Sequence, residues 1–121
     1  MNINYHDEST LMNLLPSAIY ATTTTGSAVD VREFYGKCKF ILNVSAGGTG
    51  TLDVKLTDCA TAGGSYADIV GATFTQVTTG ASLQSIGVNV DACQGFIKAV
   101  ATIGTGPQTF SLVGVGSKIQ F

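Results

Sequence analysis

Short segments in which apolar and polar residues alternate run through this chain from Ser17 onward, separated by glycine-rich turns. The clearest covers residues 38–44, where alternate side chains share one face: Cys38, Phe40, Leu42 and Val44. Residues 51–56 repeat the pattern, with Leu52, Val54 and Leu56 on one face. Because a period of two residues is typical of strands buried on one side, the chain is predicted to be all-β.

Eight or nine short strands are expected, and no helix of useful length. The candidate segments are 18–23, 27–33, 38–44, 51–56, 66–70, 73–78, 84–90, 96–103 and 110–115. The segment from Phe110 to Val115 is apolar on both faces, which predicts a central strand or a strand at a subunit contact. So many antiparallel strands must form two packed sheets or a barrel. We favour an eight- or nine-stranded sandwich of jelly-roll type over an immunoglobulin-like one, since the chain lacks the Trp typical of the latter.

The glycine-rich segment 45–50 stands between two of the clearest strands. We expect it to be a hairpin loop that pairs 38–44 with 51–56. Lys39 or Asn43 would then face Asp53 or Lys55 across the solvent side of the sheet.

Residues 1–16 differ from the rest and are predicted to be an N-terminal arm, followed by a β-sandwich domain over 17–121. A single helical turn, ended by Pro16, would carry four large apolar residues: Leu11, Met12, Leu14 and Leu15. Such a short helix needs a surface to pack on. The arm therefore docks either on its own domain or on a neighbouring subunit.

The charge of the chain excludes several classes of partner. Charged residues make up only 12% of it, the net charge is −2, and the six basic residues are scattered. Nucleic acid is not expected as a partner, because phosphate binding needs clustered Lys and Arg.

No apolar stretch is long enough to span a membrane, and the polar, acidic segment 1–8 is no secretory signal, so we expect a cytosolic product. A weakly charged surface fits a protein that packs against other subunits.

No residues form a recognisable active site, and neither a metal nor a cofactor is expected. His6, the only histidine, stands in the polar N-terminal segment, away from any predicted strand. The aspartates Asp58 and Asp91 fall at strand ends, where Asp commonly serves the backbone. The three cysteines show no metal-site spacing. A bridge between Cys59 and Cys93 would need an oxidising setting, and we expect free thiols instead.

Several stretches resemble the small structural proteins encoded in the head-gene clusters of tailed bacteriophages and prophages, most closely the capsid decoration (cement) proteins. The stretches are 28–31, 35–36, 40–43, 52–56, 66–74 and 96–102. The resemblance implies a compact sandwich, often trimeric, that binds the major capsid protein lattice on the exterior of the virion head. It would be made in the host cytoplasm and act without catalysis.

The candidate contact residues for the capsid or a second subunit are Tyr5, Leu11, Met12, Leu14, Leu15, Phe110 and Phe121. Other functions remain open at this point. The protein could be a tail, neck or fibre-associated virion module, or a sandwich that binds carbohydrate or another surface. The absence of Trp weighs against carbohydrate binding, and an enzyme is the weakest alternative.

Overall fold

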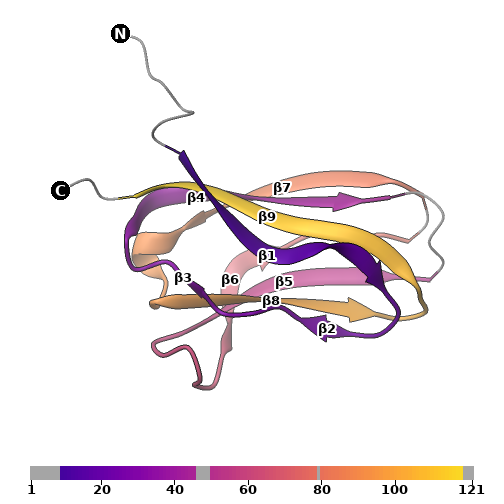
Figure 1. Ribbon diagram of the computed structural model, residues 1–121, viewed down its shortest axis with the longest axis horizontal. Helices are drawn as coiled ribbons and strands as arrows, with labels where there is room; N and C mark the ends of the chain where they lie inside the picture. The colour runs from indigo at the N-terminus through magenta and orange to yellow at the C-terminus, as the bar shows by residue number, and fades with distance from the viewer. Residues whose placement is uncertain (1–8, 46–49, 79, 119–121) are drawn as a thin grey trace, which may run out of the picture.

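The computed structural model describes residues 9–45, 50–78 and 80–118, which form two antiparallel sheets packed face to face (Figure 1). In the four-stranded sheet the order is β1 (Ser9–Tyr20), β9 (Gln108–Lys118), β4 (Phe34–Val44) and β7 (Ser82–Asn89). In the five-stranded sheet the order is β2 (Thr24–Thr25), β8 (Phe96–Ile103), β5 (Leu52–Cys59) and β6 (Ala67–Thr73). A further short strand, β3 (Val29–Asp30), also pairs with β8, and the 3-10 turn η1 (Val90–Ala92) follows β7.

The strand order is that of a jelly roll. Because β2 and β3 both pair with β8, they act as two halves of one interrupted strand. Apart from the break between β2 and β3 and the hairpin between β5 and β6, each pair of successive strands lies in opposite sheets. This wrapping of strands between two sheets confirms the predicted antiparallel sandwich of jelly-roll type.

The core lies between the two sheets and contains the faces that alternation predicts. Cys38, Phe40, Leu42 and Val44 of β4 are all buried, as are Leu52, Val54 and Leu56 of β5. From the other strands, Ile97, Phe110 and Leu112 complete the centre of the core. Each fully buried large aliphatic or aromatic side chain stabilises the fold by about 1.5–3 kcal/mol.

Glycine on β9 makes room for Phe40, one of the largest core side chains. A Cβ atom at Gly114 would lie 2.8 Å from Cε1 of Phe40 and 3.0 Å from Cε of Met12. The Phe40 ring is fully buried against this bare stretch of backbone. A residue that looks unfavourable for a strand by propensity is therefore required by packing.

The expected hairpin between β4 and β5 is wrong. β4 pairs with β7 and β9, whereas β5 pairs with β6 and β8, so the chain crosses between the sheets after Val44. The physical reason is that the apolar faces of β4 and β5 pack against each other across the core. Lys39 and Asp53 consequently lie on the outer faces of different sheets and do not meet.

The predicted helical turn over Leu11–Leu15 is also wrong. These residues belong to β1, and the proposed boundary at residue 16 falls inside that strand. Register shifts between Asn13 and Leu15 and between Leu15 and Ala18 interrupt the pairing with β9. A bulge of this kind lets two consecutive residues, Leu14 and Leu15, both enter the core, which removes the alternation that identifies a strand. The segment at Phe110–Val115 is a central strand as predicted, since β9 lies between β1 and β4.

Candidate interaction surface

The outer faces of the two sheets differ sharply in chemistry. Charged and polar pairs hold the five-stranded side: Lys55 Nζ lies 2.9 Å from a carboxylate oxygen of Asp68. The Lys98 ammonium lies 4.6 Å from the centre of the Tyr66 ring. Such side chains are solvated and already have partners within the chain, so this side resembles an ordinary protein surface.

Each strand of the four-stranded sheet contributes at least one aliphatic residue to its outer face. Ile41 of β4 lies directly opposite Val113 of β9, and Leu11 of β1 lies directly opposite Val115. Leu83 of β7 stands one row further along, opposite Asn43. We call these five residues the apolar outer face: Leu11, Ile41, Leu83, Val113 and Val115.

Two residues of the apolar outer face are exposed and the other three are half-buried, and the charged residues beside them have one sign. Leu11 is 75% exposed and Leu83 is 74% exposed, although both are large aliphatic residues. Lys37 and Lys39 of β4 are the charged residues on this side of the sheet, and the outward positions of its four strands include no Asp or Glu among the described residues. Contiguous exposed apolar surface with a polar border is typical of an interaction site.

Two shallow depressions mark this face on either side of the central strands. One, of about 430 Å³, is bordered by Leu11, Pro16 and Val113. The other, of about 330 Å³, is bordered by Lys39, Ile41 and Leu83. The face can therefore receive protruding side chains from a partner.

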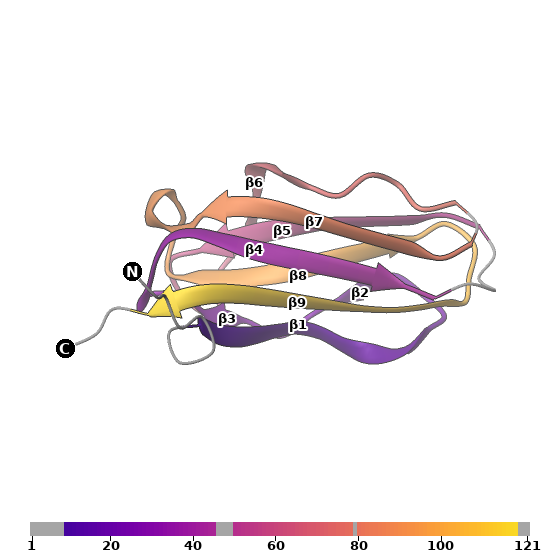
Figure 2. The ribbon, with the colours of Figure 1, turned by 90° about the horizontal axis from the view of Figure 1, so that it is seen from above.

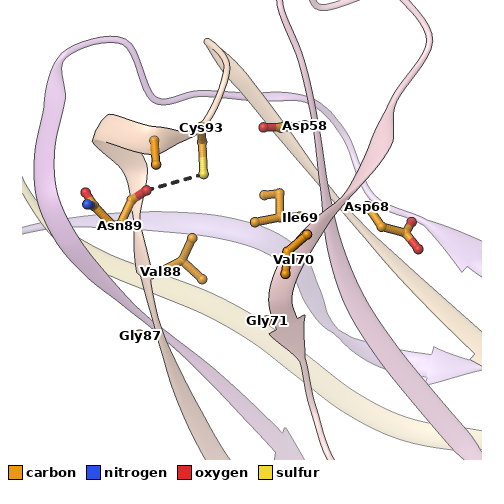
Figure 3. Close-up of a pocket in the computed structure, with 10 residues that line it drawn as sticks. Asp58, Asp68, Ile69, Val70, Gly71, Gly87, Val88, Asn89 and Cys93 are labelled. Carbon is orange, nitrogen blue, oxygen red and sulfur yellow. Dashed lines mark hydrogen bonds between the residues drawn. The ribbon is translucent and has the colours of Figure 1, made fainter.

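A cleft of about 470 Å³ lies between β6 and β7, and we call it the β6–β7 cleft (Figure 3). Its lining includes Ile69, Val70 and Val88, with Asp58 and Cys93 at one end. In Figure 3 the Cys93 thiol donates a hydrogen bond of 3.5 Å to the carbonyl oxygen of Asn89. The cleft thus combines apolar side chains with a free thiol and a carboxylate.

The groups in the β6–β7 cleft are not arranged for nucleophilic chemistry. Burial raises the pKa of the Cys93 thiol, and the charge of Asp58 raises it further. A cysteine nucleophile needs the reverse, because the thiolate is the reactive form. The Asp58 carboxylate accepts the backbone N–H of Gln94 at 3.0 Å, and His6 lies outside the described residues. The three cysteines are free thiols.

Two other carboxylates also form hydrogen bonds within the fold. Asp91 accepts the backbone N–H of Gly36 at 3.1 Å, and Asp53 accepts the side-chain amide of Gln76 at 2.9 Å. These bonds and that of Asp58 agree with the prediction that Asp58 and Asp91 serve the backbone. No group of His, Cys, Asp or Glu in residues 9–45, 50–78 and 80–118 could hold a metal ion. Over the same ranges, no helix is long and apolar enough to cross a membrane.

The structure separates the predicted contact residues into three groups. Leu11 lies on the apolar outer face. Four others are buried in the core and are not available to a partner in this fold: Met12, Leu14, Leu15 and Phe110. Tyr5 and Phe121 lie outside the described residues. The sequence prediction did not include the other four residues of the apolar outer face: Ile41, Leu83, Val113 and Val115. The two-sided apolar character of 110–115 was nevertheless a signal for the last two of them.

Comparisons with known proteins give a likeness of fold. No protein-family model and no curated protein sequence matches the chain. Among solved structures, the SPBc2 prophage-derived protein YomS aligns with 90% of this chain and 92% of its own, at 10% identity and a TM-score of 0.57. The predicted resemblance to phage-encoded proteins is therefore confirmed at the level of the fold.

Two further likenesses are to virus particles. A Cowpea Mosaic Virus empty virus-like particle matches 94% of this chain and 84% of its own, at 13% identity and a TM-score of 0.45. The infectious bursal disease virus Gx strain matches 91% of this chain but 33% of its own, at 13% identity and a TM-score of 0.46. These two TM-scores are too low to bear on function.

Proposed function

We propose that this chain is a non-enzymatic virion structural protein, a capsid decoration protein that binds the outer head lattice of a tailed phage and stabilises it. The observation that carries the proposal is the apolar outer face of the four-stranded sheet. A jelly roll that leaves five aliphatic residues on one outer face, and has the Lys55–Asp68 ion pair on the other, has one side suited to permanent contact.

The chemistry of the face defines the partner surface. Lys37 and Lys39 border the aliphatic residues, and no acidic residue of the described strands accompanies them on this side. A complementary surface on the major capsid protein would be apolar at its centre and acidic at its border. The five-stranded side is less suited to such a partner, because its Lys55 and Asp68 already pair with each other.

Binding to an assembled lattice stabilises it by mass action, because the decoration protein has higher affinity for the assembled shell than for free subunits. A homotrimer would place three copies of the apolar outer face on neighbouring capsid subunits at once. Several weak contacts then combine as avidity, so that no single contact needs high affinity. The fold likeness to a prophage-derived protein supports an origin in this class of genome.

The test uses phage particles from which the gene for this chain has been deleted. Purified protein is added, and binding is measured by cosedimentation with the particles, followed by their resistance to heat. We expect binding and raised heat resistance for the native chain. Leu11→Glu should weaken binding about 10-fold or more, since one desolvated charge costs at least about 1.4 kcal/mol.

Thr102→Glu is the matched control, because Thr102 is exposed on the five-stranded side. It adds the same charge and should bind like the native chain. Equal binding by both variants would contradict the proposed contact face. Absence of the native chain from purified heads, with presence in tails, would instead favour a tail or neck module.

A further inference from the structure

Strand β7 has a free edge whose backbone groups can be identified. Ser45 N–H donates to the carbonyl of Thr109 at 2.9 Å, which makes Ser45 and Thr109 a hydrogen-bonded pair. Backbone groups alternate along a strand, so the odd-numbered residues of β4 bond β9 and the even-numbered ones bond β7. The even-numbered residues of β7 therefore face β4. The N–H groups of the odd-numbered residues Leu83, Ser85 and Gly87 point away from β4, toward the open edge of the sheet. They have no partner among the described residues.

The other edges of the two sheets are protected against strand addition. β1 has two register shifts and contains Pro16. β6 has a register shift against β5, and its Gly71 has a φ of +81°. On the far side, β2 and β3 have two residues each. By contrast, β7 pairs with β4 over eight consecutive residues without a shift and has no charged residue. Native proteins rarely leave a regular, uncharged edge open unless another strand covers it.

A strand added to the β7 edge would also cover the β6–β7 cleft, because the edge borders that cleft (Figure 3). Val70 in its lining is completely exposed, and Ile69 is only partly buried. In strand addition, backbone hydrogen bonds provide affinity and pockets for alternate side chains provide specificity. The occupant should therefore be an extended segment with apolar residues at every second position.

The first five residues of this chain have that pattern, and the polar residues 6–8 connect them to β1. Met1, Ile3 and Tyr5 alternate with Asn2 and Asn4, so the three apolar side chains of an extended segment would lie on one face. Eight extended residues span about 26 Å, which matches the length of an eight-residue strand such as β7.

The segment can pair fully with β7 only in another copy of the chain. Residue 8 is followed by Ser9 of β1, and β1 and β7 form opposite edges of the four-stranded sheet (Figure 2). Three strand spacings separate these edges, about 14 Å. Crossing this distance uses about four extended residues, which leaves half of the segment for pairing within the same molecule.

We propose that residues 1–8 of one copy add as an extra strand to the β7 edge of a second copy, with Met1, Ile3 and Tyr5 in the β6–β7 cleft. This contact joins two different surfaces and therefore builds closed rings or open chains of subunits. It uses the edge of the sheet and leaves the apolar outer face free. This contact between copies does not depend on the proposed capsid binding, so the two proposals are tested separately.

The test measures mass by light scattering, without any capsid, for the native chain and two variants. One variant lacks residues 1–8 but keeps every described core residue. The other is Ser85→Pro, which removes an N–H from the free edge and none from the ladder with β4. We expect an oligomer for the native chain and monomers for each variant alone. An equimolar mixture should form a one-to-one complex, because one variant keeps the edge and the other keeps the segment.

Matched substitutions control for folding. Ser85→Ala keeps the edge N–H and should remain oligomeric. Ile3→Asp with Tyr5→Asp should give a monomer in the full chain, whereas Asn2→Asp with Asn4→Asp adds the same charges on the opposite face and should not. These two double variants test the proposed contact even if Ser85→Pro fails to fold. A monomeric native chain, an oligomer that survives loss of residues 1–8, or a mixture that stays monomeric would each overturn the proposal.

Discussion

The side-chain amide of Gln84 on β7 forms two hydrogen bonds with the backbone of Thr75. Its Nε2 donates to the carbonyl of Thr75 at 2.9 Å, and its Oε1 accepts the N–H of Thr75 at 2.9 Å. Thr75 follows β6 of the other sheet, so one side chain supplies the pairing that a neighbouring strand would provide. This bridge holds the two sheets together beside the free edge of β7.

Replacement of Gln84 by Leu should lower the free energy of unfolding by about 1–2 kcal/mol, because two hydrogen bonds of about 1 kcal/mol each are lost and partly replaced by water. Urea denaturation measures the change. Gln76→Leu is the control: Gln76 makes one exposed bond to Asp53 and should cost about half as much or less. Equal losses for both would show that the bridge between the sheets adds nothing.

Gly114 is expected to tolerate no side chain. Gly114→Ala should destabilise the fold by about 1–3 kcal/mol, since its Cβ would overlap the buried Phe40 ring. Gly87→Ala on β7 is the matched change, because its Cβ would meet only the flexible methylenes of Lys37. It should be neutral or slightly stabilising in thermal melts. A smaller loss at Gly114 than at Gly87 would contradict this account of the core.

Leu11 and Leu15 lie on the same strand and test the placement of β1. Leu15 is 1% exposed and Leu11 is 75% exposed. Leu15→Ala should cost about 2–5 kcal/mol of stability, whereas Leu11→Ala should change it by less than about 0.5 kcal/mol. Denaturation of the two variants measures the difference. Similarly small losses for both variants would contradict the placement of Leu15 in the core and would indicate that residues 9–16 form a detached arm.

Asp30 should contribute to stability in acid. Hydrogen bonds from the Arg32 guanidinium, and next from its backbone N–H, lower the pKa of Asp30 from 3.8 to about 2. The stabilisation is complete above pH 3.8 and is lost as the pH falls toward 2. The effect should be small, because both side chains lie at the surface, where solvent screens their interaction. NMR titration should find the low pKa in the native chain and a value near 3.8 in Arg32→Ala; a value near 3.8 in both would contradict the ion pair.

The sequence predicted the strands with regular alternation and the class of fold, but not the pairing of every strand. Alternation reports which residues face the core and does not report which sheet a strand joins, so β4 and β5 appeared to be a hairpin. The bulge at Leu14 and Leu15 interrupts the alternation in β1, so the sequence showed a cluster of apolar residues and not a strand. Of the candidate surface, Leu11 was predicted, while Ile41 and Leu83 required the strand order before they could be placed side by side.

A reconstruction of the phage head by electron cryo-microscopy would show which side of this protein faces the shell. We expect density for this chain on the outside of the head, with the β1–β9–β4–β7 sheet against the capsid protein and Leu11 and Leu83 in the contact. Density that places the five-stranded sheet against the shell, or heads that lack the protein altogether, would contradict it.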